Sequence, residues 1–159
     1  MTEFFPIGAG ISEVRAIIEI VKASGGSMQM SALSRSTKKN IDMLLPLVWA
    51  GRELGFISVS AGHIRVTSSG SALNMDNLNA YIRKGIAREE PFRTAVSVLK
   101  ARGSISTRQL SKALKHKGIV LYSQEKGNED ALRHILQKWA VRCKLLGYND
   151  AHDTWSLRE

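Results

Sequence analysis

The sequence contains one cysteine, no long apolar run and no secretion signal. Because Cys143 is the only cysteine, no disulfide can form within the chain and cysteine ligands cannot build a zinc site. No apolar stretch approaches the roughly 18 residues that a transmembrane helix needs. The first residues lack the basic segment followed by an apolar one that marks a secretory signal. These absences predict a cytoplasmic protein without a membrane span.

Catalytic motifs are also missing. There is no GxxxxGK[ST] loop, so we expect no ATPase site of its own. There is no HExxH, no CxxC and no arrangement of paired carboxylates. His152 and Asp153 near Asp150 fit a polar turn better than a metal site, and Cys143 beside Trp139 fits a small core residue better than a reactive thiol. We therefore expect no enzyme activity, no metal and no cofactor.

Basic residues outnumber acidic ones, mainly in the second half of the chain. The 23 Lys and Arg against 14 Asp and Glu give a formal net charge of +9. Residues 1–74 hold 7 basic and 5 acidic residues, and residues 75–159 hold 16 and 9, so the halves carry +2 and +7. Such a surface attracts nucleic acid, anionic membrane or an acidic protein, although a solvated lysine-rich surface has the same composition.

The stretch over residues 40–67 indicates a helix followed by a hairpin. Apolar residues recur at intervals of three and four, as on the buried face of a helix, and this pattern stops at Gly55. The positions are Ile41, Leu44, Leu45, Val48, Trp49 and Leu54. Alternating apolar residues then flank a turn at Ala61 and Gly62, which predicts a two-stranded ribbon. A helix that leads directly into a ribbon is typical of the last part of a winged helix.

A second helix and ribbon are predicted near the end of the chain. We expect a helix over residues 129–146 after a loop at residues 118–128, and a short ribbon that ends with Trp155, Ser156 and Leu157. The inner face of this helix is predicted to comprise Leu132, Ile135, Leu136, Trp139, Cys143 and Leu146. The chain therefore repeats one plan: a helix, a short strand, two helices and a ribbon.

These patterns predict a mainly α-helical protein, of α+β winged-helix type, with two tandem units. Residues 10–74 form the first winged-helix-like unit and residues 91–159 form the second. Residues 75–90 are expected to be the connecting helix. Each unit should carry a small β-ribbon.

Several motifs resemble a known family. The specific ones are the DMLLP run at residues 42–46 and the ELGF run at 53–56, and the others are IRVT at 64–67 with Gly70, PFR at 91–93, residues 139–148 and WSL at 155–157. Over about residues 10–158 the chain resembles the AAA-associated C-terminal domain family. The resemblance implies a winged-helix-like domain of the kind that follows the ATPase in some ABC transporter proteins of the nitrate/sulfonate/taurine type and stands alone in some archaeal proteins. It implies an ABC transporter ATPase as partner and no catalytic residues.

Two functions are consistent with the sequence. The first is a non-catalytic regulatory or interaction module, whose apolar lead at Phe4, Phe5 and Ile7 and first helix form a partner or homodimer surface. The second is a transcriptional regulator that binds duplex DNA through largely non-specific phosphate contacts of the basic second unit. The helix over residues 40–54 has a proline, an acid in its first turn and one late arginine, so we expect it to pack rather than to read bases.

The candidate nucleic-acid-binding residues are basic and are predicted to point outward from the connecting helix or from the second unit. They are Arg83, Lys84, Arg88, Arg108, Lys112, Lys115, Arg133, His134, Lys138 and Arg142. Candidate phosphate contacts in the first unit are Lys38, Lys39 and Arg65.

Overall fold

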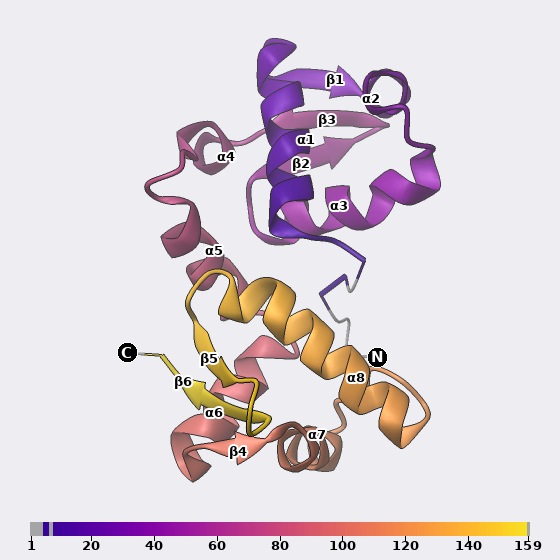
Figure 1. The fold of residues 1–159 in the computed structure, drawn as a ribbon. Helices are drawn as coiled ribbons and strands as arrows, with labels where there is room; N and C mark the ends of the chain where they lie inside the picture. Colours follow the sequence, from indigo (N-terminus) through magenta and orange to yellow (C-terminus); the bar gives the residue numbers. More distant parts are fainter. Residues whose placement is uncertain (1–4, 7, 159) are drawn as a thin grey trace. The chain divides into compact units, whose positions relative to one another are not determined.

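The computed structural model describes residues 5–6 and 8–158, which form two compact units (Figure 1). The N-terminal unit comprises residues 8–77, and the C-terminal unit comprises residues 5–6 together with residues 78–158. The predicted class, mainly α-helical with small antiparallel sheets, is confirmed. The sequence places the ends of the two winged-helix-like units at residues 74 and 91. Whether these segments fold independently remains a prediction. Among the described residues, no helix combines the length and the apolar composition that crossing a bilayer requires.

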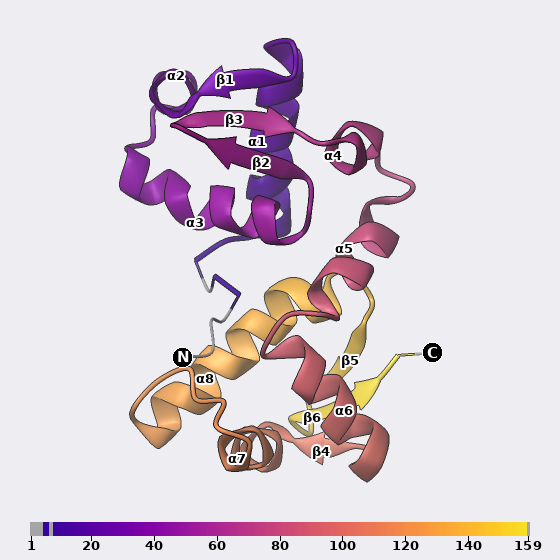
Figure 2. The same cartoon turned by 180° about the vertical axis from the view of Figure 1, so that it is seen from behind.

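The N-terminal unit consists of four helices and one three-stranded antiparallel sheet. In chain order its elements are α1 (Ile11–Ala23), β1 (Ser27–Gln29), α2 (Met30–Thr37), α3 (Ile41–Glu53), β2 (Ile57–Ser60), β3 (His63–Val66) and α4 (Ser68–Ala72). The strand order is β1-β3-β2, with Val59 opposite Ile64 across the predicted hairpin. The views from the two sides show α1 against one face of this sheet (Figures 1 and 2). The buried side chains of α1 include Val14, Ile17, Ile18 and Val21.

Local interactions define both ends of α3. At its start the Asn40 side chain accepts a hydrogen bond of 2.9 Å from the backbone N–H of Met43, which satisfies a donor that the helix leaves unpaired. At its end Gly55 adopts a φ of 81°, a left-handed conformation that glycine tolerates best. Pro46 lies inside α3 and has no N–H to donate, yet the helix continues to Glu53. The bounds predicted for this helix are confirmed to within a residue.

The C-terminal unit repeats the order of elements after one additional helix. Its elements are α5 (Leu78–Ile86), α6 (Phe92–Arg102), β4 (Ile105–Ser106), α7 (Thr107–His116), α8 (Glu125–Ile135), the π-helix η1 (Leu136–Val141), β5 (Leu146–Asn149) and β6 (Thr154–Leu157). The strand order is β4-β6-β5, again antiparallel with the last strand in the centre. The connecting helix expected over residues 75–90 is shorter, because α5 ends at Ile86.

The long helix predicted at residues 129–146 differs from the structure at both ends. It begins at Glu125, so the last four residues of the loop expected at 118–128 are helical. It ends as the π-helix η1 at Val141. The predicted inner face is nevertheless buried throughout. The residues from Leu132 to Trp139 keep the three- and four-residue spacing of one helix face. Cys143 follows η1, and Leu146 begins β5.

Phe5 belongs to the core of the C-terminal unit. Its ring makes edge contacts with the rings of Phe92 and Trp139, at centroid distances of 5.6 and 4.6 Å, and it is 2% exposed. Its backbone N–H donates to the carbonyl of Glu90 at 2.9 Å. The expectation that Phe5 contributes to an exposed partner surface is therefore wrong. Phe4 and Ile7, the other members of that predicted surface, lie outside the described residues.

The Phe5→Ala substitution should lower the free energy of unfolding of the C-terminal unit by about 3–5 kcal/mol, because it leaves a cavity between two aromatic rings. Urea unfolding followed by tryptophan fluorescence measures this change. The matched control is Tyr81→Ala, which removes an exposed ring from α5 of the same unit. Equal stability of the two variants would contradict the placement of Phe5 in the core.

Candidate functional site

The most unusual surface of the N-terminal unit is the start of α3, where three large apolar side chains face solvent. Ile41 is 44% exposed, Met43 is 56% exposed and Leu45 is 48% exposed. Seven large apolar side chains are exposed among the described residues, and these three fall within five consecutive positions. The prediction that Ile41 and Leu45 belong to the buried face was wrong.

The packing of α3 explains why these side chains are left outside. Its buried face is formed by Leu44, Leu47, Val48, Ala50 and Gly51. A methyl group added at Gly51 would lie 3.0 Å from Cδ1 of Ile57 on β2 and 3.7 Å from Cγ1 of Val14 on α1. This close approach directs one side of the helix into the core. Trp49 lies at the margin, half-buried, and donates from Nε1 to Glu53 at 3.1 Å.

The predicted phosphate contacts of this unit lie on separate elements. Lys38 is exposed in the turn between α2 and α3, where its φ of 58° is left-handed. Lys39 follows it and lies 3.9 Å from a carboxylate oxygen of Glu13. Arg65 is exposed on β3, opposite Ser27 and Ser58. Lys38 and Lys39 therefore flank the start of α3, but Arg65 is on the central strand of the sheet.

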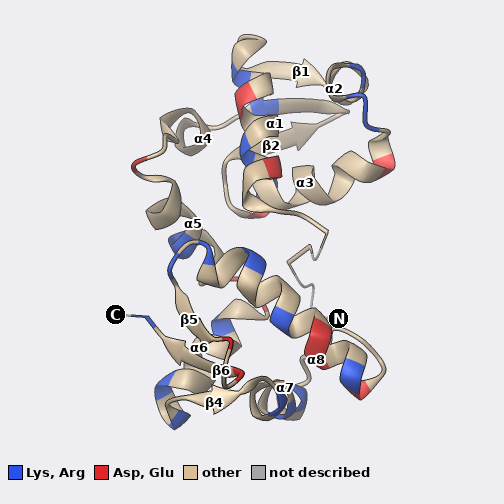
Figure 3. Ribbon diagram, viewed as in Figure 1, with Lys and Arg blue, Asp and Glu red and all other residues tan. Residues whose placement is uncertain are grey.

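Several of the basic residues predicted to bind nucleic acid have structural partners. Arg83 donates to the carbonyl of Cys143 at 2.9 Å, and Arg108 pairs with Glu129 at 3.4 Å. Arg133 pairs with Asp130 at 3.0 Å. The other candidates, Lys84, Arg88, Lys112, Lys115, His134 and Arg142, are exposed, and Lys138 is half-buried. Figure 3 shows Lys and Arg along α5, α7 and α8, with Asp and Glu also on α8.

Asp153 organises the polar side of the second ribbon. Its Oδ1 accepts hydrogen bonds from the Thr107 hydroxyl at 2.6 Å and the Tyr148 hydroxyl at 2.7 Å, and it lies 3.4 Å from Nε of Arg133. Thr107 in turn accepts from Nε1 of the buried Trp155 at 2.8 Å. Arg133, one of the candidate DNA contacts, is therefore part of a network that joins α8, α7 and the ribbon.

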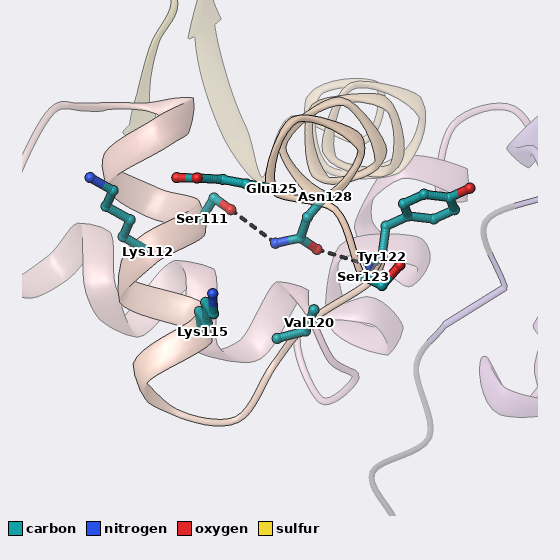
Figure 4. A pocket seen from close by; sticks show the side chains of 8 residues that line it. All are labelled: Ser111, Lys112, Lys115, Val120, Tyr122, Ser123, Glu125 and Asn128. Atoms are coloured by element: carbon teal, nitrogen blue, oxygen red, sulfur yellow. Dashed lines mark hydrogen bonds between the residues drawn. The ribbon is translucent and has the colours of Figure 1, made fainter.

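A small pocket opens in the C-terminal unit beside α7. It has a volume of about 150 Å³. The lining comes from α7, the following loop and the first turn of α8 (Figure 4): Ser111, Lys112, Lys115, Val120, Tyr122, Ser123, Glu125 and Asn128. Two predicted nucleic-acid contacts, Lys112 and Lys115, are brought together here.

No cluster of three or more His, Cys, Asp or Glu side chains suited to a metal ion occurs within residues 5–6 and 8–158. Cys143 is fully buried, as predicted. Burial raises the pKa of its thiol to about 11, so the reactive thiolate is scarce at neutral pH.

Comparison with protein families gives one match. The model of the C-terminal AAA-associated domain matches residues 31–149, which is most of the chain and includes α3 and the pocket. The chain belongs to the C-terminal AAA-associated domain family. A search of curated proteins and a search of solved structures found no significant match.

In this member of the family, the exposed residues of α3 overlap the DMLLP run at residues 42–46 that carried the resemblance. Sequence reasoning did not identify α3 as a surface, because its apolar residues recur at the spacing of a buried face. The number of apolar residues at the start of α3 could have revealed this surface. Ile41, Met43 and Leu45 surround the buried Leu44, and one side of a helix cannot bury all four.

The Asp153 network contributes to stability in a pH-dependent way. Burial alone would raise the pKa of Asp153, but the hydrogen bonds from Thr107, Tyr148 and Arg133 outweigh it and lower the pKa. A lowered pKa in the folded state stabilises the fold above the unfolded value of about 3.9, and this contribution disappears as pH falls through the folded value. The hydrogen bond to Asp153 raises the pKa of Tyr148.

Asp153→Asn should therefore reduce the free energy of unfolding by about 1–2 kcal/mol at neutral pH, a modest loss because Asp153 is partly exposed. The difference from the unsubstituted protein should shrink as pH falls below the unfolded value of about 3.9 and through the lower folded pKa of Asp153. Urea unfolding at a series of pH values measures it. Asp150→Asn in the same turn, where Asp150 is exposed, is the control. A difference that stays constant into acid would contradict the role assigned to the charge.

Proposed function

We propose that this chain is a non-catalytic interaction module of the cytoplasm that binds a protein partner through the outward face of α3. We further propose that the partner is an ABC-type ATPase, whose activity the module regulates. Membership of the C-terminal AAA-associated domain family supports an accessory role beside an ATPase. The observation that carries the proposal is the exposure of Ile41, Met43 and Leu45 in the first five residues of α3.

We also propose that both units are winged helices. In each unit a helix, a strand, two helices and two strands follow one another, and the final strand lies in the centre of the sheet. In a winged helix of this order α3 occupies the place of the recognition helix, which DNA-binding proteins insert into the major groove. Three of the five exposed residues of α3 are apolar, and apolar side chains cannot form the hydrogen bonds that distinguish base pairs.

An exposed apolar group of this kind suits a protein interface. Interface cores are depleted of charge, and a few large side chains near the centre contribute most of the binding energy. Lys38 in the preceding turn and Arg52 in the last turn of α3 lie at the two ends of the group, and the exposed Asp42 lies within it, between Ile41 and Met43. Three large apolar side chains around one carboxylate favour a protein partner over nucleic acid, because an exposed carboxylate repels phosphate.

Leu45→Lys should weaken binding to a purified ABC-type ATPase of the same organism at least about tenfold, because it places a charge at the centre of the proposed interface. Calorimetric titration of the ATPase with each variant measures the affinity. The control, Ser69→Lys, adds the same charge at an exposed position of α4 in the same unit. Both variants should unfold at the temperature of the unsubstituted protein, since both positions are exposed.

Equal affinity of the Leu45→Lys and Ser69→Lys variants would refute α3 as the interface. Sedimentation velocity of the same proteins tests the homodimer alternative. Self-association that Leu45→Lys abolishes would identify a second copy of the chain as the partner of this face.

DNA binding by the C-terminal unit is a second candidate, favoured by charge. Residues 78–158 hold 16 basic and 7 acidic residues, and no ion pair involves Lys84, Arg88 or Lys138 within the described residues. Contacts from these side chains to phosphates would give affinity without sequence preference, and salt would weaken it through counterion release.

If this candidate is correct, the protein should bind a fluorescent mixed-sequence duplex with a Kd below about 1 µM at low salt. Its affinity should fall at least about tenfold at high salt. Lys138→Glu and Lys84→Glu should each weaken binding more than Lys22→Glu, the same charge change on α1. Arg133 is unsuitable for reversal, because its loss would also disturb the contact with Asp153. No binding at low salt would exclude this function.

A further inference from the structure

The pocket beside α7 plays no part in the proposed α3 interface, and its shape is maintained by a buried side chain. Oδ1 of Asn128 accepts hydrogen bonds from the backbone N–H groups of Leu121 and Tyr122 at 2.7 and 3.0 Å. Its Nδ2 donates to the hydroxyl of Ser111 at 3.0 Å (Figure 4). Asn128 thus ties the loop to both α7 and α8, so the pocket exists before any ligand binds.

Gly127 brings an aromatic ring to the rim of the pocket. A methyl group at Gly127 would lie 2.6 Å from Cδ1 of Tyr122, which is closer than two carbon atoms can approach. Because glycine has no side chain, the Tyr122 ring lies against the first turn of α8. Tyr122 and Val120 are exposed, and they are two of the seven large apolar side chains exposed among the described residues.

The charged lining favours an anion. Lys112 and Lys115 lie one turn apart on α7, and within the part of the chain that the structure describes neither forms an ion pair. Glu125 is the one acidic side chain of the lining, and it pairs with neither lysine. Neither ammonium group is held in an ion pair, so both lysines can turn toward an anion in the pocket.

A buried hydroxyl group adds a donor. Ser111 is 5% exposed, and its oxygen accepts the hydrogen bond from Asn128. No acceptor for its own hydroxyl proton occurs among the residues that the structure describes. A buried hydroxyl usually donates as well as accepts, so a ligand oxygen in the pocket would complete its hydrogen bonding.

We infer that this pocket binds a small phosphomonoester that carries an aromatic group. The phosphoryl oxygens lie beside the ammonium groups of Lys112 and Lys115 and accept from Ser111, while the aromatic group packs on Tyr122 and Val120. A phosphomonoester matches two lysines better than a carboxylate does, because it carries nearly two negative charges and lysine acts as a point charge toward phosphate. A volume of about 150 Å³ suits a phosphoryl group and part of a small ring.

Calorimetric titration of the full chain with phenyl phosphate tests this inference. We expect saturable binding with a Kd on the order of 1 mM or below, and weaker binding of inorganic phosphate and of benzoate. Lys112→Gln and Lys115→Gln should each lower the affinity for phenyl phosphate at least about fivefold. Glu125→Gln should raise this affinity, because it removes a negative charge that repels the phosphate. Lys100→Gln, an exposed lysine on α6, is the control and should bind as the unsubstituted protein does.

Three results would overturn the inference. The first is the absence of saturable binding at about 10 mM phenyl phosphate. The second is a loss of affinity in the Lys100→Gln control equal to that of the Lys112→Gln and Lys115→Gln variants. The third is an affinity for benzoate equal to that for phenyl phosphate. Tyr122→Ala separates the two parts of the proposed ligand. It should weaken phenyl phosphate and leave inorganic phosphate unchanged, and an equal effect on both would exclude the aromatic contact.

Discussion

The close approach of α3 to β2 and α1 at Gly51 determines which side chains of the N-terminal unit face solvent. Since the helix rests with its backbone almost against Ile57, its rotation about its own axis is fixed. Leu44, Leu47 and Val48 then enter the core, and the apolar residues on either side of Leu44 remain outside. The proposed partner surface is thus a direct consequence of core packing, and not a separate feature added to it.

The C-terminal unit uses the same order of elements with a different chemistry on its surface. Its long helix is held by a polar network in which Thr107 links the buried Trp155 to Asp153, and Asp153 links it to α8 through Arg133. The outward side chains there are charged, and several are paired. Two units with the same order of elements therefore differ in surface chemistry: apolar side chains are exposed on a helix in one, and two lysines line a pocket in the other.

The elements with clear periodicity or turn residues were predictable from sequence, because local interactions set them. The Asn40 cap, the left-handed Gly55 and the hairpin at Ala61 and Gly62 are examples. The start of α8 was not predictable in the same way, since Glu125 begins a helix that depends on long-range hydrogen bonds of Asn128 with the preceding loop and α7. The placement of Phe5 also depends on residues more than 80 positions away. The candidate DNA contacts were chosen by charge, and the ion pairs that some of them form depend on tertiary structure, which charge counting does not include.

The central claim is that the outward face of α3 contacts a protein partner. Hydrogen–deuterium exchange of the chain, measured alone and in complex with an ABC-type ATPase of the same organism, tests it most directly. The account predicts that protection on binding concentrates in peptides covering the α2–α3 turn and the first half of α3, residues 38–46, while α7 and α8 exchange as in the free protein. Protection confined to the C-terminal unit, with unchanged exchange over residues 38–46, would contradict it.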